Sequence, residues 1–250
     1  MPTVNLSTLG YNASITAAST NYPQEFLVYN TSINSITNGG AACVWTVPNG
    51  VTFVTFEIWG GGGGGSGSCC CMQIGQGAGA GGYAVKTVYN NGGLGGCVYC
   101  ICAGGSTGTN TSQPGCSGYP SYVTGYGLTN FCACGGAQGC TTCFQYGNCY
   151  ICQISVCCSY ACGGDIVAYG YRGSAVQTQF CYSYGWSLHP TAPATVSGPF
   201  IGPNGCNIGG CTNWTNGPFP GGGGYGAHVV SGGCCQGMWG AGGLVSITYG

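Results

Sequence analysis

The chain of 250 residues has a formal net charge of −1 and only 2% charged residues, whereas it contains 54 glycines and 22 cysteines. Acid–base catalysis and nucleic-acid binding depend on ionisable side chains, so this composition disfavours both enzymes and nucleic-acid-binding proteins. It favours a non-enzymatic structural or adhesive protein, and we expect neither catalytic residues nor a cofactor.

Residues 1–40 differ from the rest because they are rich in Asn, Ser and Thr and lack cysteine. Within them, residues 25–33 have the composition of a strand. We interpret residues 1–40 as an N-terminal attachment segment or a first strand, and residues 41–250 as one glycine- and cysteine-rich β domain. The start lacks the basic and apolar regions of a signal peptide, and we expect no membrane insertion.

Short strand-like segments separated by glycine clusters then follow along the chain. Asn49-Gly50 predicts a turn, and residues 51–59 carry apolar side chains on both faces, which is typical of a strand in a sandwich. Further strands are predicted at 83–89, 97–102, 122–123, 131–134, 166–169 and 244–249. Glycine interrupts every window long enough for a helix. The sequence therefore predicts an all-β, glycine-rich, jelly-roll-like β-sandwich with long loops.

The glycine clusters, such as the six glycines at 60–65, have two interpretations. They are either flexible linkers or extended polyglycine II segments that pack side by side, because glycine allows backbones to approach closely. Aromatic residues beside the clusters, Trp59 and Tyr225, fit the second interpretation.

Three segments in chain order, 45–65, 77–88 and 240–250, resemble the glycine-rich domain of tailed-bacteriophage virion proteins, including tail fibre and adhesin tips. The cysteine-dense segments at 69–71, 97–102 and 132–162 are similar to those of cysteine-rich virion structural proteins of marine cyanobacterial phages. This resemblance implies a virion component, made in the host cytoplasm and exposed on the released particle.

The cysteines are candidate disulfide or packing residues. Three interpretations stay open: disulfides that stabilise a chain poor in large aliphatic residues, reduced thiols that pack as small apolar groups, and zinc or iron–sulfur ligands in C-x-x-C pairs. The candidates are Cys69, Cys70, Cys71, Cys97, Cys100, Cys102, Cys132, Cys134, Cys140, Cys143, Cys149 and Cys152.

Aromatic side chains within glycine-rich loops are candidate binding residues, because rigid rings give contact area at a low entropic cost. The alternative is that these rings form the hydrophobic core. The candidates are Tyr119, Tyr122, Tyr126, Tyr182, Tyr184, Trp186, Trp214 and Phe219.

The function most consistent with these observations is a fibre or adhesive component of a phage particle. The alternatives are a capsid decoration protein that stabilises the head and, from a different class, a metal-binding or redox cysteine protein. Near-zero net charge removes the repulsion between copies, so we expect a homo-oligomer, and a trimer if the protein forms a fibre. Its expected partners are other virion proteins and a host cell-surface receptor.

Overall fold

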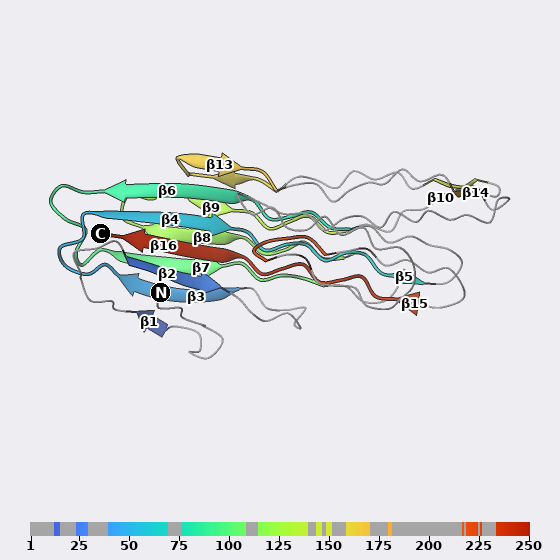
Figure 1. Cartoon of the computed structure of the whole chain (residues 1–250), viewed down its shortest axis with the longest axis horizontal. Coiled ribbons are helices and arrows are strands. Elements are labelled where there is room, and N and C mark those ends of the chain that lie inside the picture. The colour runs from blue at the N-terminus through green and yellow to red at the C-terminus, as the bar shows by residue number, and fades with distance from the viewer. Residues whose placement is uncertain are drawn as a thin grey trace.

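All regular secondary structure in the described residues is β-strand (Figure 1). The structure is a computed structural model, and it describes residues 13–15, 24–29, 40–69, 77–108, 115–139, 144–146, 149–151, 159–170, 180–181, 217, 219–224, 226 and 234–250. Within these ranges, none of the secondary structure is a helix long and apolar enough to cross a membrane.

The first large sheet has five antiparallel strands. In spatial order they are β13 (Ile166–Ala168), β6 (Tyr83–Tyr89), β4 (Phe53–Trp59), β16 (Leu244–Tyr249) and β2 (Gln24–Tyr29). The strand β16, which ends one residue before the C-terminus, lies between β4 and β2. The middle of this sheet therefore joins segments that lie far apart in the sequence, namely β4 and β16.

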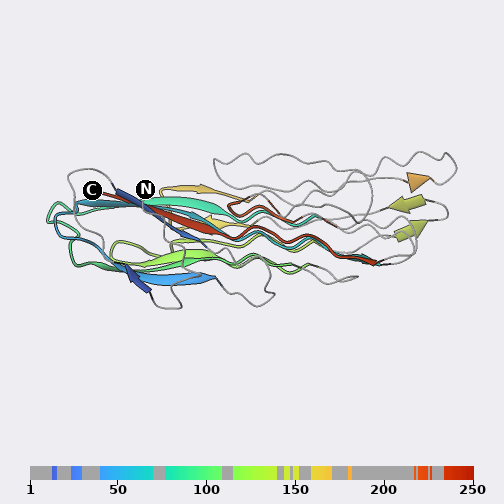
Figure 2. The same cartoon turned by 60° about the horizontal axis from the view of Figure 1, so that its bottom comes forward.

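The second large sheet has six strands, of which β1 pairs in parallel and the other pairings are antiparallel. In order they are β1 (Ala13–Ile15), β3 (Ala41–Thr46), β7 (Val98–Ala103), β8 (Ser121–Gly125), β9 (Cys132–Ala133) and β12 (Ala161–Cys162). The two large sheets form the two layers of a β-sandwich, which Figure 2 shows from the side.

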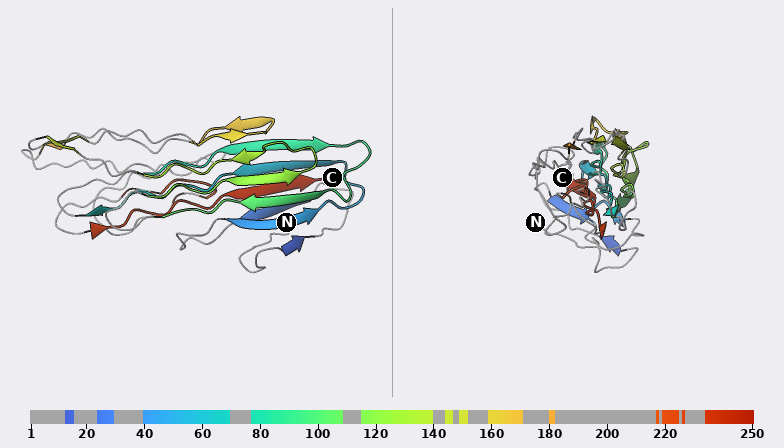
Figure 3. Two further views of the ribbon diagram at one scale, coloured as in Figure 1. Left: turned by 180° about the vertical axis from the view of Figure 1, so that it is seen from behind. Right: turned by 90° about the vertical axis from the view of Figure 1, so that its right-hand side faces the viewer.

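Two small sheets lie at the opposite end of the molecule from the chain terminus at Gly250 (Figures 1 and 3). One pairs β5 (Ser68–Cys69) with β15 (Cys234–Cys235). The other contains β10 (Phe144–Tyr146), β11 (Cys149–Ile151) and β14 (Phe180–Cys181). The strands of the sandwich run along the long axis that separates the two ends.

Alternation of side chains explains why the two sheets face each other. In β4, Val54, Phe56 and Ile58 are fully buried, whereas Thr55 and Glu57 on the other face are only partly buried. Facing side chains from β3 and β7, including Trp45 and Tyr99, complete the same core. Burial of one face of each strand fixes its register, because a shift by one residue would expose the apolar set.

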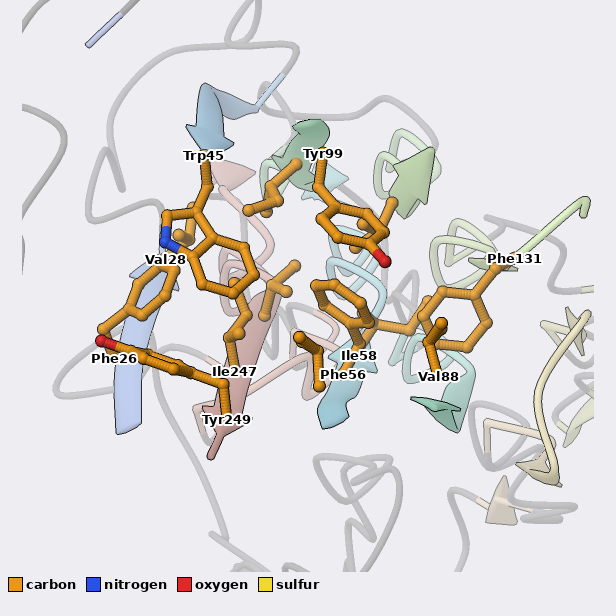
Figure 4. Packing of buried hydrophobic residues seen from close by; sticks show 14 of the residues in the cluster. Phe26, Val28, Trp45, Phe56, Ile58, Val88, Tyr99, Phe131, Ile247 and Tyr249 are labelled. Atoms are coloured by element: carbon orange, nitrogen blue, oxygen red, sulfur yellow. The ribbon is translucent and has the colours of Figure 1, made fainter. Parts of the chain in front are cut away.

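Aromatic rings fill much of this core (Figure 4). The ring of Trp45 stacks on Tyr99 with centroids 6.0 Å apart and contacts Phe26 edge-on at 5.3 Å. The ring of Phe56 lies 4.9 Å from that of Tyr99. Large rings thus supply the apolar area that a chain poor in leucine and isoleucine lacks.

One ion pair fastens the edge of the first sheet. The Asp165 carboxylate, just before β13, accepts hydrogen bonds from the Lys86 ammonium group and from the backbone N–H of Thr87 in β6. Both bonds lower the pKa of Asp165, since they stabilise its charged form. The Asp165 side chain therefore links the start of β13 to β6.

The all-β sandwich is confirmed, and so are most of the predicted strands. Strands β6 and β16 have the predicted bounds, and β4, β7, β8, β9 and β13 differ from prediction at their ends only. Strand β2 begins at Gln24 and ends at Tyr29, and residues 30–33 of the predicted segment lie outside the described residues. Strands β1 and β12 were not predicted, because segments as short as Ala161–Cys162 carry no detectable alternation, and a strand at the position of β3 was implied only by the resemblance of residues 45–65.

A glycine shaft and a thiol–tyrosine face as candidate functional sites

Six strands of the sandwich leave it at the same end and continue as glycine-rich segments (Figure 1). Residues 60–65, which follow β4, lie in the middle and contact six other segments. These are residues 77–82, 104–108, 115–119, 134–139, 221–224 and 237–241. We call the seven segments together the glycine shaft, and none of their residues is charged.

The central segment donates its backbone hydrogen bonds in a repeating order. Of residues 60–65, the first and fourth donate to residues 79–82, the second and fifth to 116–119, and the third and sixth to 238–241, over 2.8–3.1 Å. The direction of the N–H group therefore repeats after every third residue. None of these bonds lies within the segment, so the segment is held entirely by its neighbours.

Carbonyl groups of the same segment accept bonds from further neighbours. The carbonyl oxygens of Gly61 and Gly64 accept from Gly136 and Gly139, at 2.8 and 3.0 Å, and that of Gly63 accepts from Gly224 at 2.9 Å. Residues 60–66 are buried throughout. Buried backbone groups must be paired to avoid a large desolvation cost, and the shaft meets this condition by bonds between segments.

Only glycine fits at the centre of the shaft. A Cβ atom added at any residue from 60 to 64 would lie closer than 3.0 Å to backbone atoms of a neighbouring segment. At Gly62 these atoms belong to Gly222, and at Gly61 to Gly105. The spacing between segments thus requires the glycine run itself, and the flexible-linker interpretation is wrong for these residues.

Buried hydroxyl groups join the shaft to itself and to the sandwich. The Ser121 hydroxyl donates to the carbonyl of Trp59 and accepts from the N–H of Gly104 at 2.8 Å. The Thr107 hydroxyl donates to the carbonyl of Cys116 and accepts from the N–H of Gly64 at 3.2 Å. The Thr107 hydroxyl thus adds a second bond to two backbone groups that also bond to each other, and the Ser121 hydroxyl links the end of β4 to the segment after β7.

The second candidate site is the outer face of the second sheet. Strand pairing aligns Cys102, Tyr122, Cys132 and Cys162 in one row across β7, β8, β9 and β12. Cys100, Cys134 and Tyr160 lie beside this row on the same face, since residues two apart in a strand share a face. We call these seven residues the thiol–tyrosine face.

Side chains on this face contact one another. The Cys132 and Cys162 sulfur atoms are 3.1 Å apart, and the Cys162 thiol donates to the carbonyl of Asn130 at 2.9 Å. The Tyr122 hydroxyl bonds to Cys102, and the Tyr160 hydroxyl bonds to Cys134. Cysteine and tyrosine side chains thus contact one another across this polar but uncharged face.

The surroundings keep two thiols of this face protonated at neutral pH. Burial raises the pKa of Cys102. Burial, and then the hydrogen bond with Cys162, raise the pKa of Cys132. Because the thiolate is the nucleophile and the metal ligand, both residues are poor nucleophiles at neutral pH.

The first C-x-x-C pair does not converge. Cys97 is packed against the core, whereas Cys100 is exposed on the outer face. Residues three apart in an extended chain point to opposite faces. In the described ranges, no group of three or more His, Cys, Asp or Glu side chains could hold a metal ion.

The remaining cysteine candidates are placed in part. Cys69 and Cys149 belong to β5 and β11 by their backbones, opposite Cys234 and Cys181. Sequence reasoning missed Cys162, because only the strand register shows that it faces Cys132. Five candidates, Cys70, Cys71, Cys140, Cys143 and Cys152, lie outside the described residues.

The aromatic candidates divide in the same way. Tyr122, Tyr126 and Phe219 are exposed by 41%, 53% and 52%, so they are available for contacts. Tyr119 is partly buried, and its backbone belongs to the shaft. The other candidates, Tyr182, Tyr184, Trp186 and Trp214, lie outside the described residues.

Thiol accessibility gives a direct test of this arrangement. We expect Cys43, which is 3% exposed, and Cys102, which is 7% exposed, to react with iodoacetamide at pH 8 at least about tenfold more slowly in the native protein than in urea. Burial raises the pKa of Cys43 to about 11, so its reaction should accelerate as the pH rises towards that value. Exposed Cys100 is the internal control, and mass spectrometry of quenched samples gives the rates. Equal native rates at all three sites would contradict the placement.

The fold and these two sites define an all-β sandwich that is prolonged by hydrogen-bonded glycine segments. The chain matches no known protein-family model and no curated protein. Its function must therefore be inferred from its own geometry.

Proposed function

We propose that this protein is a non-enzymatic structural protein of a tailed-bacteriophage particle, and that it acts as a fibre or adhesive appendage. The observation that carries the proposal is the glycine shaft. It extends the sandwich in one direction, and its backbone groups are paired between segments rather than left to water. Such a shaft is suited to hold loops at a distance from an attachment point.

The glycine segments are polyglycine II helices in this proposal. A helix of this type has three residues per turn and no internal hydrogen bonds. The three-residue repeat of donors in residues 60–65, and the six surrounding segments, support this description. The chain also crosses between the large sheets from β3 to β4, from β6 to β7 and from β12 to β13, which supports a jelly-roll-like sandwich.

The far end of the shaft is the proposed contact region. Strands β5 and β15, and β10, β11 and β14, lie there (Figure 1). Tyr182 follows β14 directly in the sequence, with Tyr184 and Trp186 close behind. Aromatic residues that follow β14 in the sequence suit binding to a cell-surface receptor by ring stacking and hydroxyl hydrogen bonds rather than by charge.

Location and copy number test this proposal. An antibody against the recombinant protein should label purified phage particles in immunogold electron microscopy, at the tail or its fibres. Quantitative mass spectrometry should give a copy number far below that of the major capsid protein. Label spread over the head at a copy number similar to that of the capsid protein would instead establish the decoration role. Absence from purified particles would refute both roles.

Self-association is the next step of the proposal. Strand β13 lies at the edge of the first sheet as described, and its Ile166 and Val167 are exposed by 61% and 44%. Apolar edge strands pair readily with another chain, and a net charge of −1 gives little repulsion between copies. We therefore propose a homo-oligomer in which β13 contributes to the interface.

A charge on this edge should weaken the oligomer. We expect Ile166→Lys to raise the dissociation constant at least about tenfold, measured by analytical ultracentrifugation at micromolar concentration. Val98→Lys is the matched control, because Val98 is 50% exposed on the outer face of the other sheet. A wild-type protein that stays a folded monomer, or an equal effect of both variants, would contradict this interface.

A further inference from the structure

Strand register places cysteines at directly opposed backbone positions at three separate places in the described structure. Cys132 lies opposite Cys162 in β9 and β12, Cys69 opposite Cys234 in β5 and β15, and Cys149 opposite Cys181 in β11 and β14. All three are antiparallel pairs. Cysteine fills 22 of 250 positions, so such coincidences are not expected to recur by chance among so few paired positions.

We propose that these three pairs are specific disulfide sites, which oxidation closes after the strands have paired. Directly opposed residues of antiparallel strands have Cα atoms about 4.5–5.5 Å apart. This separation falls within the range of about 4.4–6.8 Å that a disulfide spans. The Cα separation expected from the register is therefore suitable for a disulfide at all three places.

Side-chain geometry supports the Cys132–Cys162 pair directly. Its two sulfur atoms are 3.1 Å apart, and both residues are partly buried on the outer face of the second sheet. Cys134 also hydrogen-bonds to Cys132, but it lies two residues away on the same strand segment and contacts the Tyr160 hydroxyl, whereas Cys162 lies directly opposite Cys132 across the strand pair. Closure would fasten β12, at the edge of the second sheet as described, to β9, and each of these strands is only two residues long.

The positions of the Cys69–Cys234 and Cys149–Cys181 pairs suggest that all three bonds stabilise the glycine shaft. Both belong to the small sheets at the far end of the shaft, whereas Cys132–Cys162 belongs to the sandwich beside the base of the shaft (Figures 1 and 3). The three bonds would fasten the shaft at both ends. This role holds for any extracellular or oxidising setting and does not depend on a phage origin.

The chemistry needs an oxidant, for which we specify a low-molecular-weight disulfide such as oxidised glutathione. One cysteine thiolate attacks the oxidant disulfide, forms a mixed disulfide and releases one oxidant thiol. The facing cysteine then attacks the protein sulfur of that mixed disulfide and releases the second thiol. Two electrons pass to the oxidant, and the two cysteine protons end on the two released thiols.

Peptide mapping tests the pairing. The reduced, folded protein is incubated with oxidised glutathione, its free thiols are alkylated in urea, and it is digested with pepsin at acid pH, where disulfide exchange is slow. Tandem mass spectrometry should then identify 132–162, 69–234 and 149–181 as the dominant linkages. Alkylation of all 22 cysteines, or dominant linkages between other partners, would overturn the proposal.

Thermal unfolding of oxidised and reduced samples tests the bond at the base of the shaft. For Cys132→Ser, for Cys162→Ser and for the double variant, the melting-temperature difference between oxidised and reduced protein should fall by about the same amount, roughly 5–10 °C. Comparing the two redox states of each variant removes the effect of serine on folding itself.

Cys100→Ser is the matched control for these variants. Cys100 is exposed on the same face, but it lies opposite Val44 and Thr124 and therefore has no facing cysteine. Its oxidised-to-reduced difference should equal that of the wild type. Effects of the two single variants that add in the double variant, or a similar loss in Cys100→Ser, would overturn the pairing.

Discussion

Replacing Gly62 by alanine is expected to destabilise the protein by at least about 3 kcal/mol, the upper part of the usual range for overpacking. The N–H of Gly62 donates to the carbonyl of Ala241, and its added Cβ would collide with the backbone of Gly222. A colliding backbone cannot move aside as a flexible side chain can. The segments must separate, and each then loses hydrogen bonds that no water replaces in the buried shaft.

Gly92→Ala is the matched control for this substitution. Gly92 is exposed in the turn between β6 and β7, and the nearest atom to an added Cβ is the Asn90 side-chain oxygen at 3.4 Å. We expect a change of less than about 0.5 kcal/mol there. Urea denaturation followed by tryptophan fluorescence measures both variants. Equal stability of Gly62→Ala and wild type would show that residues 60–65 are not closely packed.

Strands rich in β-branched and aromatic residues and bounded by glycine could be predicted from the sequence, because these residue types favour extended, packed backbone. Residues 83–89 and 244–249 were predicted with the bounds that the structure gives. The pairing of β16 with both β2 and β4 could not be predicted, since it joins residues more than 180 positions apart and depends on the packed core. Short strands such as Cys132–Ala133 and Ala161–Cys162 owe their existence to their neighbours rather than to propensity.

The glycine run shows where sequence reasoning reaches its limit. Residues 60–65 carry no side chain, so composition alone leaves a linker and a packed segment equally open. Six neighbouring segments decide between them, because they supply the partners of its backbone groups. A usable signal exists, however: the run follows directly on a buried strand, and other glycine-rich segments flank β6, β7 and β8 on the same side.

The candidate sites were predictable only by residue type. Cysteine density indicated the thiol-rich character, but facing pairs such as Cys132 and Cys162 are set by register across 30 residues of chain. The aromatic rings that form the core belong to residues outside the candidate set, such as Trp45, Phe56 and Tyr99, which are fully buried. Tyr122, Tyr126 and Phe219 are exposed instead, and no sequence pattern separates the two groups.

Alkaline pH is expected to unfold the protein, whereas the free energy of unfolding should be nearly constant from about pH 5 to 8. In the described residues, the pKa values raised by burial belong to cysteine and tyrosine groups. Burial raises the pKa of Cys43 to about 11 and that of Tyr99 to about 12, and it also raises that of Tyr249. Burial, with the nearby Glu57 carboxylate, raises the pKa of Tyr83.

The direction follows from proton linkage. A group whose pKa is raised by folding stabilises the native state fully below its unfolded pKa, and this stabilisation is lost as the pH rises towards the folded value. The unfolded values are 9.0 for cysteine and 10.0 for tyrosine. The free energy of unfolding should therefore begin to fall near pH 9 and continue to fall to about pH 12. Salt should have little effect, because only 2% of the residues are charged.

Cys43 and Tyr99 set the size of the alkaline effect. Between pH 9 and 11, ionisation of Cys43 in the unfolded chain should lower the free energy of unfolding by about 2 kcal/mol. Between pH 10 and 12, ionisation of Tyr99 in the unfolded chain should lower it by a similar amount. Their sum approaches the whole stability of a typical domain. Urea denaturation in reductant at pH 7, 9, 10 and 11 measures the loss. Cys43→Ala should reduce it by about 2 kcal/mol between pH 9 and 11, whereas Cys100→Ala, at an exposed site, should leave it unchanged. A free energy of unfolding that stays constant to pH 11 would show that these groups are not buried as the structure places them.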